Sequence, residues 1–403
     1  MKQLNPQSWA TMPGLGSRLV AWWRQALFAI AACAALLPGC GGGVGTGGTG
    51  SFASGPITGF GSVIVNEVHF DESQAAVEDG DGNRHSSAEL RLGMTVEIDA
   101  GAITTTAGGS VALATRIRVD SELLGPVGTV NAAGGSFTLL GQTVSVDATT
   151  VFDESLAGGL LGLTPGSPVQ VFALFDPATA RYRATRVEPA SALLAWHLRG
   201  PVADVAALAQ TLRIGGVTYS FAGAGSVPVG LAVGQFVRIK LSAAGPPAGR
   251  FAISAFGAAL QSLADADGVK FKGLISDFTS ATSFAVNGRA VDASGLALSG
   301  LGLGARVEVE GVLRNGVLRA SKVRLSSDQE ERDRGFELSG AITAVDAAQR
   351  TFVLRGQTVG TTRADLRYQN GSAADLAVGR RVEIKGQLSV DGRHVDATEI
   401  KFN

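Results

Sequence analysis

Hydrophobic and polar residues alternate along many short segments of this chain, with the period of two that a strand with one buried face produces. Val307 and Val309, for example, alternate with three charged residues in the segment 306–310. An Asn315-Gly316 pair follows, and such a pair favours a tight hairpin because both turn positions need positive φ. Helical periodicity of any length is hard to find after residue 40. The pattern predicts an all-β protein built from short strands and tight turns.

One strand segment recurs along the chain as the frame L-x-x-G-x-x-V-x-[VI], first at 90–98 and last at 376–384. Its glycine occurs five times, at Gly93, Gly166, Gly234, Gly304 and Gly379. A second frame, first seen as Ala114–Val119, follows each copy and is degraded in the third. Landmarks that repeat in one order predict tandem units. We place the units at 55–121, 122–191, 192–262, 263–328 and 329–403.

The recurring glycines are 68 to 75 residues apart, which leaves room for about five short strands in each unit. A sheet this small can bury one face only by closing on itself. We therefore predict five tandem small antiparallel β-barrels of the OB-like type. Each unit is longer than a typical solenoid turn, so a row of beads is favoured. The mixed-charge run Asp328–Arg334 predicts a solvated linker between the last two units.

The first forty residues have a different character from the rest. Arg18 and Arg24 precede an uncharged run of twelve residues, 26–37, which ends in Leu37-Pro38-Gly39-Cys40. The run is too short to cross a hydrocarbon core, which needs roughly 20 residues, and it has the layout of a secretory signal. We expect residues 1–39 to be a signal peptide that is cleaved between Gly39 and Cys40. The Gly-rich sequence that follows predicts a flexible tether over 40–54.

Leu37, Gly39 and Cys40 resemble the lipobox of bacterial lipoproteins, whose cysteine is acylated on sulfur and then on its new amine. The resemblance implies lipidation of Cys40 and makes a membrane the first expected partner. In lipoproteins of two-membrane bacteria, Asp after the cysteine commonly marks retention in the inner membrane, and this chain has Gly41 there. An outer-membrane address in the cell envelope is therefore implied. An ordinary signal peptide with an incidental cysteine is the alternative.

The repeat itself also resembles a known family. Gly59–Asn66 is the clearest example of its G-x-[IV] and V-x-[VI]-[NG] pattern. The resemblance is to bacterial envelope lipoproteins built from tandem copies of an uncharacterised domain, domain of unknown function 5666. It extends over the chain from Gly55 onward. It implies tandem architecture and an envelope address, and it supplies no catalytic residues.

Composition narrows the chemistry further. Without residues 1–39 the chain has 31 basic and 35 acidic residues, a net charge of −4, and no basic stripe, which argues against nucleic acid as a partner. Only one cysteine, Cys40, then remains, so a disulfide framework is excluded. The four histidines do not lie at metal-ligand spacing on one element. We expect no metal and no cofactor.

Several motifs suggest a function, but each also has a simpler structural interpretation. The acidic turn 79–83 begins like a calcium loop, but Arg84 and Leu90 occupy the positions of the required Gly and Glu, so we expect a polar turn. Carboxylates at outward strand positions are expected to be solvated surface groups, namely Glu97, Glu308, Glu310 and Glu383. Phenylalanines at strand positions are expected in the core, namely Phe152, Phe284 and Phe352.

Trp196, His197 and Arg199 form the most ligand-like cluster, near the start of the third unit. Small barrels often bind glycans or oligonucleotides on an aromatic sheet face, and Trp196 is the only tryptophan after residue 39. The cluster therefore supports an alternative function, which is binding of a glycan or small ligand near Trp196.

The leading hypothesis is a non-enzymatic lipoprotein whose barrels serve structural or multivalent binding roles, with an envelope protein or glycan as its partner. The sequence contains no nucleophile elbow, metalloprotease helix, phosphate loop or dinucleotide fingerprint. An enzyme would need a site built between units from residues far apart in sequence. The oligomeric state is left open.

Overall fold

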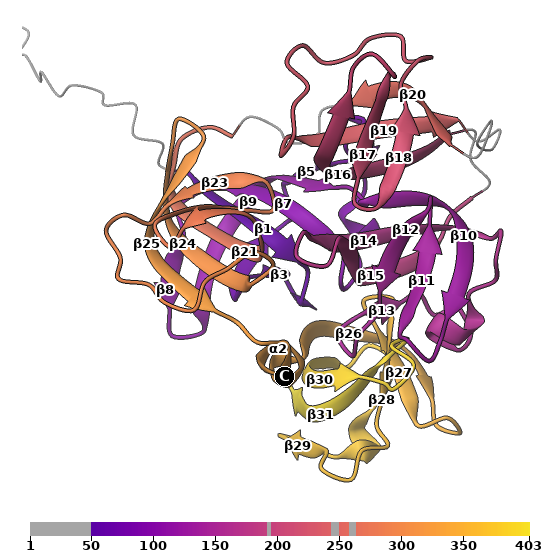
Figure 1. Cartoon of the computed structure of the whole chain (residues 1–403). Helices are drawn as coiled ribbons and strands as arrows, with labels where there is room; N and C mark the ends of the chain where they lie inside the picture. Colours follow the sequence, from indigo (N-terminus) through magenta and orange to yellow (C-terminus); the bar gives the residue numbers. More distant parts are fainter. Residues whose placement is uncertain (1–49, 192–194, 243–249, 258–262) are drawn as a thin grey trace, which may run out of the picture. The chain divides into compact units, whose positions relative to one another are not determined.

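The computed structural model describes residues 50–191, 195–242, 250–257 and 263–403. Strands predominate in these residues, and one α-helix lies among them. The strands form small closed barrels around hydrophobic cores (Figure 1). The predicted all-β class with small OB-like barrels is therefore confirmed.

Barrel 1 shows the strand order that recurs along the chain. Its strands are β1 (Ser51–Pro56), β2 (Gly59–Phe60), β3 (Val63–Val65), β4 (Val68–Asp71), β5 (Ala76–Glu78), β6 (Arg84–His85), β7 (Thr95–Ala100), β8 (Thr104–Thr106) and β9 (Gly109–Val119). β1 and its continuation β2 pair with β7 and β3, β3 pairs with β4, and β7 pairs with β9. A parallel pairing of β4 with β9 closes the barrel. This is the order 1-2-3-5-4-1 of an OB-like barrel.

Barrels 2 and 3 follow the same order. Barrel 2 consists of β10 (Leu123–Asn131), β11 (Ser136–Leu139), β12 (Gln142–Ser145), β13 (Val151–Phe152), β14 (Pro168–Asp176) and β15 (Arg181–Pro189). Barrel 3 consists of β16 (Ala195–Ala206), β17 (Thr211–Ile214), β18 (Val217–Ser220), β19 (Phe236–Ser242) and β20 (Phe251–Gly257). Parallel pairings of β12 with β15 and of β18 with β20 close them.

Barrels 4 and 5 complete the described chain. Barrel 4 consists of β21 (Ala266–Ser280), β22 (Ser283–Val286), β23 (Arg289–Asp292), β24 (Arg306–Arg314) and β25 (Val317–Leu325). Barrel 5 consists of β26 (Phe336–Asp346), β27 (Thr351–Leu354), β28 (Gln357–Gly360), β29 (Arg367–Gln369), β30 (Arg381–Leu388) and β31 (Val395–Phe402). Parallel pairings of β23 with β25 and of β28 with β31 close them.

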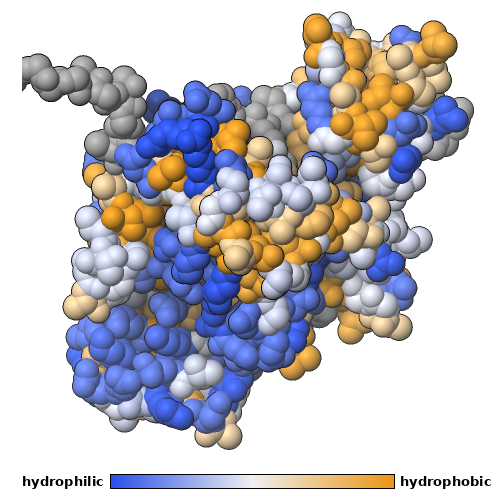
Figure 2. All heavy atoms as spheres, turned by 60° about the vertical axis from the view of Figure 1, so that its left-hand side comes forward, coloured by the Kyte–Doolittle hydropathy of each residue, from blue (hydrophilic) through white to orange (hydrophobic). Residues whose placement is uncertain are grey.

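The core consists of the inward positions of these strands. Phe152, Phe284 and Phe352 are all buried, as their strand positions predict. The apolar residues of barrels 1 and 5 form one continuous cluster and those of barrels 2 and 3 form another. Hydrophilic and apolar residues are mixed on the outer surface that Figure 2 shows.

The barrels are not a row of beads, because strands pair across their edges. β1 pairs in parallel with β21 of barrel 4, β2 pairs in parallel with β26 of barrel 5, and β10 pairs with β16 of barrel 3. Two extended sheets result, of 20 and 11 strands among the described residues. Sequence periodicity reports which face of a strand is buried but not which edge finds a partner, so it could not reveal this arrangement.

The segment predicted as a solvated linker is a helix, α2 (Asp328–Arg334). Ser327 caps it: its hydroxyl accepts a hydrogen bond from Glu330 N at 3.1 Å, and Ser327 N donates to Glu330 Oε2 at 2.7 Å. On its inner face Glu331 forms an ion pair with the buried ammonium of Lys272 in β21. The segment does link barrels 4 and 5 and contains no buried residue, but it is helical, because the buried ammonium supplies the tertiary contact that a short polar helix needs.

Candidate functional site

The strongest candidate site lies at the linker Asp120-Ser121-Glu122, which joins β9 of barrel 1 to β10 of barrel 2. With only three residues between the strands, the linker is pressed against its neighbours. Glu122 N donates to Val171 O at 3.0 Å, and Glu122 O accepts from Arg199 N at 2.8 Å. Three consecutive polar residues are thereby held between β14 and β16. We call this region, with the charged side chains around it, the charged junction.

The Glu122 side chain is mostly buried at this junction, with 12% of its surface exposed. It accepts hydrogen bonds from Ala173 N at 2.8 Å and from the Thr95 hydroxyl at 3.3 Å. Burial raises the pKa of Glu122 to about 7, although the nearby Arg199 guanidinium opposes the shift. At neutral pH the group therefore exists in both its protonated and its ionised form.

The guanidinium of Arg199 is largely buried and poorly partnered. Its nearest carboxylate is Glu122, with 3.8 Å between Nη1 and Oε1, and its Nε has no hydrogen-bond acceptor among the described residues. The backbone of Arg199 is held firmly, since the Tyr182 hydroxyl donates to its carbonyl at 2.8 Å. The strand is thus well positioned while the charged group lacks acceptors.

Arg118 of β9 is a second guanidinium with unused donors. Its Nη2 donates to Asp99 Oδ2 at 2.8 Å. Its Nε and Nη1 lie 3.5 Å from Glu78 and 3.7 Å from Glu97, within ion-pair range but without hydrogen bonds. Glu97 in turn pairs with Arg289 of barrel 4 at 2.5 Å.

Asp120 and the acidic turn 79–83 form the outer part of the junction. Arg238 of β19 donates to Asp120 Oδ1 at 3.2 Å and to Asp81 Oδ1 at 2.7 Å, and Lys240 reaches Asp81 at 2.8 Å. The turn closes on itself, because Asp79 Oδ1 accepts from the backbone N–H groups of Asp81 and Asn83. Within the described residues no group of three His, Cys, Asp or Glu side chains is arranged to hold a metal ion.

Two of the carboxylates expected to be solvated are mostly buried between barrels. The Glu97 side chain is 16% exposed and that of Glu308 is 18% exposed. Burial alone would raise the pKa of Glu308, but its pairs with Arg334, with Arg324 at 2.5 Å and with Lys272 at 3.5 Å lower that pKa to about 2. The expectation failed because another element covers each outward position: Arg289 of barrel 4 lies against Glu97, and Arg334 of α2 lies against Glu308. Glu310 and Glu383 are more exposed.

The structure separates the residues of the predicted ligand cluster. Strand alternation directs Trp196 towards the core of barrel 3, where its ring lies 6.3 Å from that of Phe251, and directs His197 and Arg199 to the junction. His197 is buried, its Nε2 lies 2.9 Å from Ser121 O, and burial lowers its pKa to about 4. A neutral ring that donates to Ser121 O fits these contacts. The ligand-binding role of the three residues stays a prediction.

A small cavity of about 80 Å³ opens at the junction. Its charged lining comprises Glu97, Arg118, Asp120, Glu122, Arg199 and Arg289, and its apolar lining includes Phe175, Phe236 and Phe271. Arg199 is the only one of these that sequence reasoning had selected as a ligand-binding residue. For the other charged residues of the lining, the sequence carries one signal, which is the polar triplet 120–122 between two repeats.

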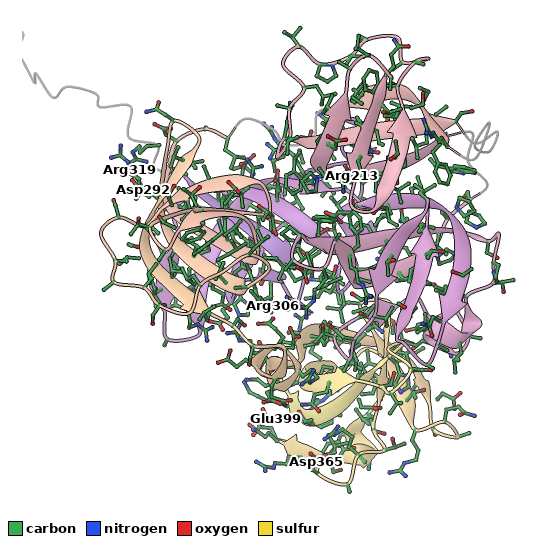
Figure 3. All side chains as sticks on the ribbon, viewed as in Figure 1. Arg213, Asp292, Arg306, Arg319, Asp365 and Glu399 are labelled. Atoms are coloured by element: carbon green, nitrogen blue, oxygen red, sulfur yellow. The ribbon has the colours of Figure 1, made fainter. Side chains whose placement is uncertain are left out.

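Other charged groups lie apart from this cavity. Arg306, labelled in Figure 3, lies against α2 with its Nε 3.4 Å from Asp328 Oδ1. Arg319 and Asp365 lie exposed at the outer surface. The predicted cleavage and lipidation residues, Gly39 and Cys40, are outside the described residues. No helix in the described part of the chain is long and apolar enough to cross a membrane.

A comparison with known protein families matches three segments of the chain. A family described as "Domain of unknown function (DUF5666)" matches residues 125–188, 272–324 and 339–401, which correspond to barrels 2, 4 and 5. These segments carry the domain expected from the sequence resemblance. The family match covers three segments, so it does not test the predicted count of five units.

The remaining comparisons add little. No curated protein sequence matches the chain. Among solved structures, "drosophila Unr CSD456" is 13% identical, with 51% of this chain and 97% of that chain covered and a TM-score of 0.15. A TM-score this low adds nothing to the fold described above.

Proposed function

We propose that this chain, with its segments of a domain of unknown function, is a non-catalytic lipoprotein of the bacterial cell envelope, anchored by acylated Cys40 and most consistent with the outer membrane. The lipobox-like sequence Leu37–Cys40 supports the anchor. The lack of any catalytic sequence motif supports a role without chemistry. Several acyl chains hold a protein at a membrane far more firmly than one.

The position of the first strand supports a body held close to the lipid. Ten residues, 41–50, separate Cys40 from the start of β1 at Ser51, four residues earlier than the predicted start of the first unit. At about 3.5 Å per residue, this segment spans at most about 40 Å. The barrels would therefore act at the membrane surface.

The observation that carries the proposed role is strand pairing between barrels. The pairs β1–β21, β2–β26 and β10–β16 cover edges that would otherwise be open. Barrels joined in this way present several binding faces at set spacings, which favours multivalent contact with an envelope protein or glycan. A structural role at the membrane surface would use the same strand pairing between barrels.

Membrane fractionation of cells that express the wild-type chain or the Cys40→Ser variant tests the anchor. We expect the wild-type protein in the membrane pellet and the variant in the soluble fraction, because the variant lacks the acylated sulfur. Cys33→Ser is the matched control: Cys33 lies in the segment expected to be removed, and the change should not alter partitioning. A Cys40→Ser protein that remains with the membranes would refute the proposal.

A further inference from the structure

We propose that the cavity at the charged junction binds one small oxyanion between the guanidinium groups of Arg118 and Arg199. This inference goes beyond the envelope role and does not depend on the lipid anchor. Both guanidinium groups line the same cavity of about 80 Å³, one from β9 of barrel 1 and one from β16 of barrel 3.

Unsatisfied donors are the first argument. Arg118 is 9% exposed, and its Nε and Nη1 have no hydrogen-bond partner among the described residues. Arg199 Nε is also buried and has no hydrogen-bond partner among the described residues. Leaving a buried donor unpaired costs about 1 to 3 kcal/mol, and more for a charged group. The planar guanidinium fork matches the oxygens of a carboxylate or phosphate, so an oxyanion supplies the acceptors that the protein lacks.

The balance of charge is the second argument. Of the acidic groups that line the cavity, Glu97 is paired with Arg289 and Asp120 is paired with Arg238. Glu122 is the remaining carboxyl, and it lies beyond hydrogen-bond distance of Arg199. Arg118 is already paired with Asp99 at 2.8 Å, so the cation left without a carboxylate when Glu122 is protonated is Arg199. The O–H of protonated Glu122 can then donate to the ligand.

Cavity size defines the class of ligand. The cavity volume of about 80 Å³ is several times the roughly 10 to 15 Å³ that one water needs on the same measure, so the cavity admits a compact ion of a few non-hydrogen atoms. Acetate, nitrate and inorganic phosphate are ions of this kind. The phenylalanine side chains in the lining lower the local dielectric and strengthen the interaction with a small anion.

Proton uptake should accompany binding. Glu122 is faced by Arg199 of β16 and Tyr182 of β15, and by Asp120 in its own linker. Burial raises its pKa to about 7, so an entering anion meets a mixture of protonated and ionised Glu122 at neutral pH. An anion next to this group favours the protonated form. Binding should therefore weaken as pH rises from 6 to 8.

Titration calorimetry on the full mature chain carrying Cys40→Ser tests the proposal, with acetate, nitrate, phosphate and chloride as separate probes. We expect one-to-one binding of at least one oxyanion, weaker binding of chloride, and a tighter Kd at pH 6 than at pH 8. Arg199→Gln should weaken binding at least tenfold. Arg199→Lys, which keeps the charge and loses the fork, should have an intermediate Kd.

Arg213→Gln is the matched control. Arg213 lies in β17 of the same barrel, is exposed, and donates to the carbonyl oxygens of Gly215 and Ala203 instead of lining the cavity. Its loss should leave Kd unchanged, and thermal unfolding of each variant checks that the barrels remain folded. The proposal is overturned if no oxyanion binds, if both variants weaken binding equally, or if a crystal structure in the presence of the anions shows only water in the cavity.

Discussion

At the scale of single residues, burial shifts the pKa values of two titratable groups at the junction. Glu122 lies in the linker before β10 and His197 lies in the neighbouring strand β16, and both side chains are largely buried. Burial disfavours the charged form of each, so it raises the pKa of the acid and lowers that of the base. Both groups are therefore driven towards neutrality in a region where the arginines remain charged.

The Glu122 shift predicts a pH dependence of stability. The ordinary pKa of the group is 4.5 and the folded value is about 7. Between these pH values the unfolded chain loses the proton while the folded chain keeps it. The contribution of Glu122 to stability is therefore greatest below pH 4.5 and falls as pH rises to 7. The loss attributable to this group is on the order of 3 kcal/mol. Glu122→Gln should abolish it, as measured by urea unfolding at pH 5 and pH 7.5.

The prediction concerns the difference between the variant and the wild type. His197 acts in the opposite direction, since its lowered pKa removes stability as pH falls from 6.5 towards 4. This contribution is present in both proteins and cancels in the difference. Parallel stability curves for the two proteins between pH 5 and 7.5 would contradict the burial of an ionisable group at position 122.

At the scale of elements, α2 depends on its cap and on one buried ion pair. The helix has seven residues, too few to be stable in isolation. Ser327 and Glu330 satisfy backbone N–H groups at its start, and Glu331 meets Lys272. Local hydrogen bonds and a tertiary contact together make a helix from a segment with no apolar face.

Ser327→Ala should lower the free energy of unfolding by about 1 kcal/mol, because it leaves one of the first helical N–H groups without an acceptor. Denaturant unfolding measures the change. Ser283→Ala, at an exposed position of β22, is the control and should change stability by less than about 0.5 kcal/mol. Equal effects of the two substitutions would show that the cap does not stabilise α2.

At the scale of the whole molecule, close contact between barrels depends on positions without side chains. Gly59 of β2 lies opposite Glu337 of β26 in the pairing between barrels 1 and 5. A Cβ at residue 59 would overlap the carbonyl oxygen of Glu337 and would lie 2.7 Å from Ile64 Cδ1. The glycine is required here for packing.

Gly59→Ala should therefore destabilise the protein by about 1 to 3 kcal/mol, the usual range for overpacking. Thermal unfolding measures the loss, and hydrogen exchange at Phe60 and Leu338 should increase because the strand pair is disrupted. Gly295→Ala, where an added Cβ meets no atom within 4 Å, is the control. A wild-type melting temperature for Gly59→Ala would show that this contact is not tightly packed.

Period-two alternation and turn signals were sufficient to predict the fold, because they report local preferences that the barrel keeps. Val307 and Val309 are fully buried as their pattern predicts, and Asn315 adopts the positive φ expected of its turn. The repeat also carried enough information to recognise the domain in 125–188 and in the two later matches. Sequence alone therefore determined the class of fold, the domain family of the three matched segments and the inward face of strands such as 306–310.

Tertiary structure decided which outward faces meet. Glu97 and Arg289 are 192 residues apart in sequence, and nothing local indicates that they pair at 2.5 Å. Glu122 and Arg199 likewise become a site only because β10 pairs with β16. Hydrophobic patterning is set by burial within one barrel, whereas charged residues on an outer face have the same pattern whether water or another barrel lies against them. The candidate site is made of such residues, so it emerged only from the packing of the barrels.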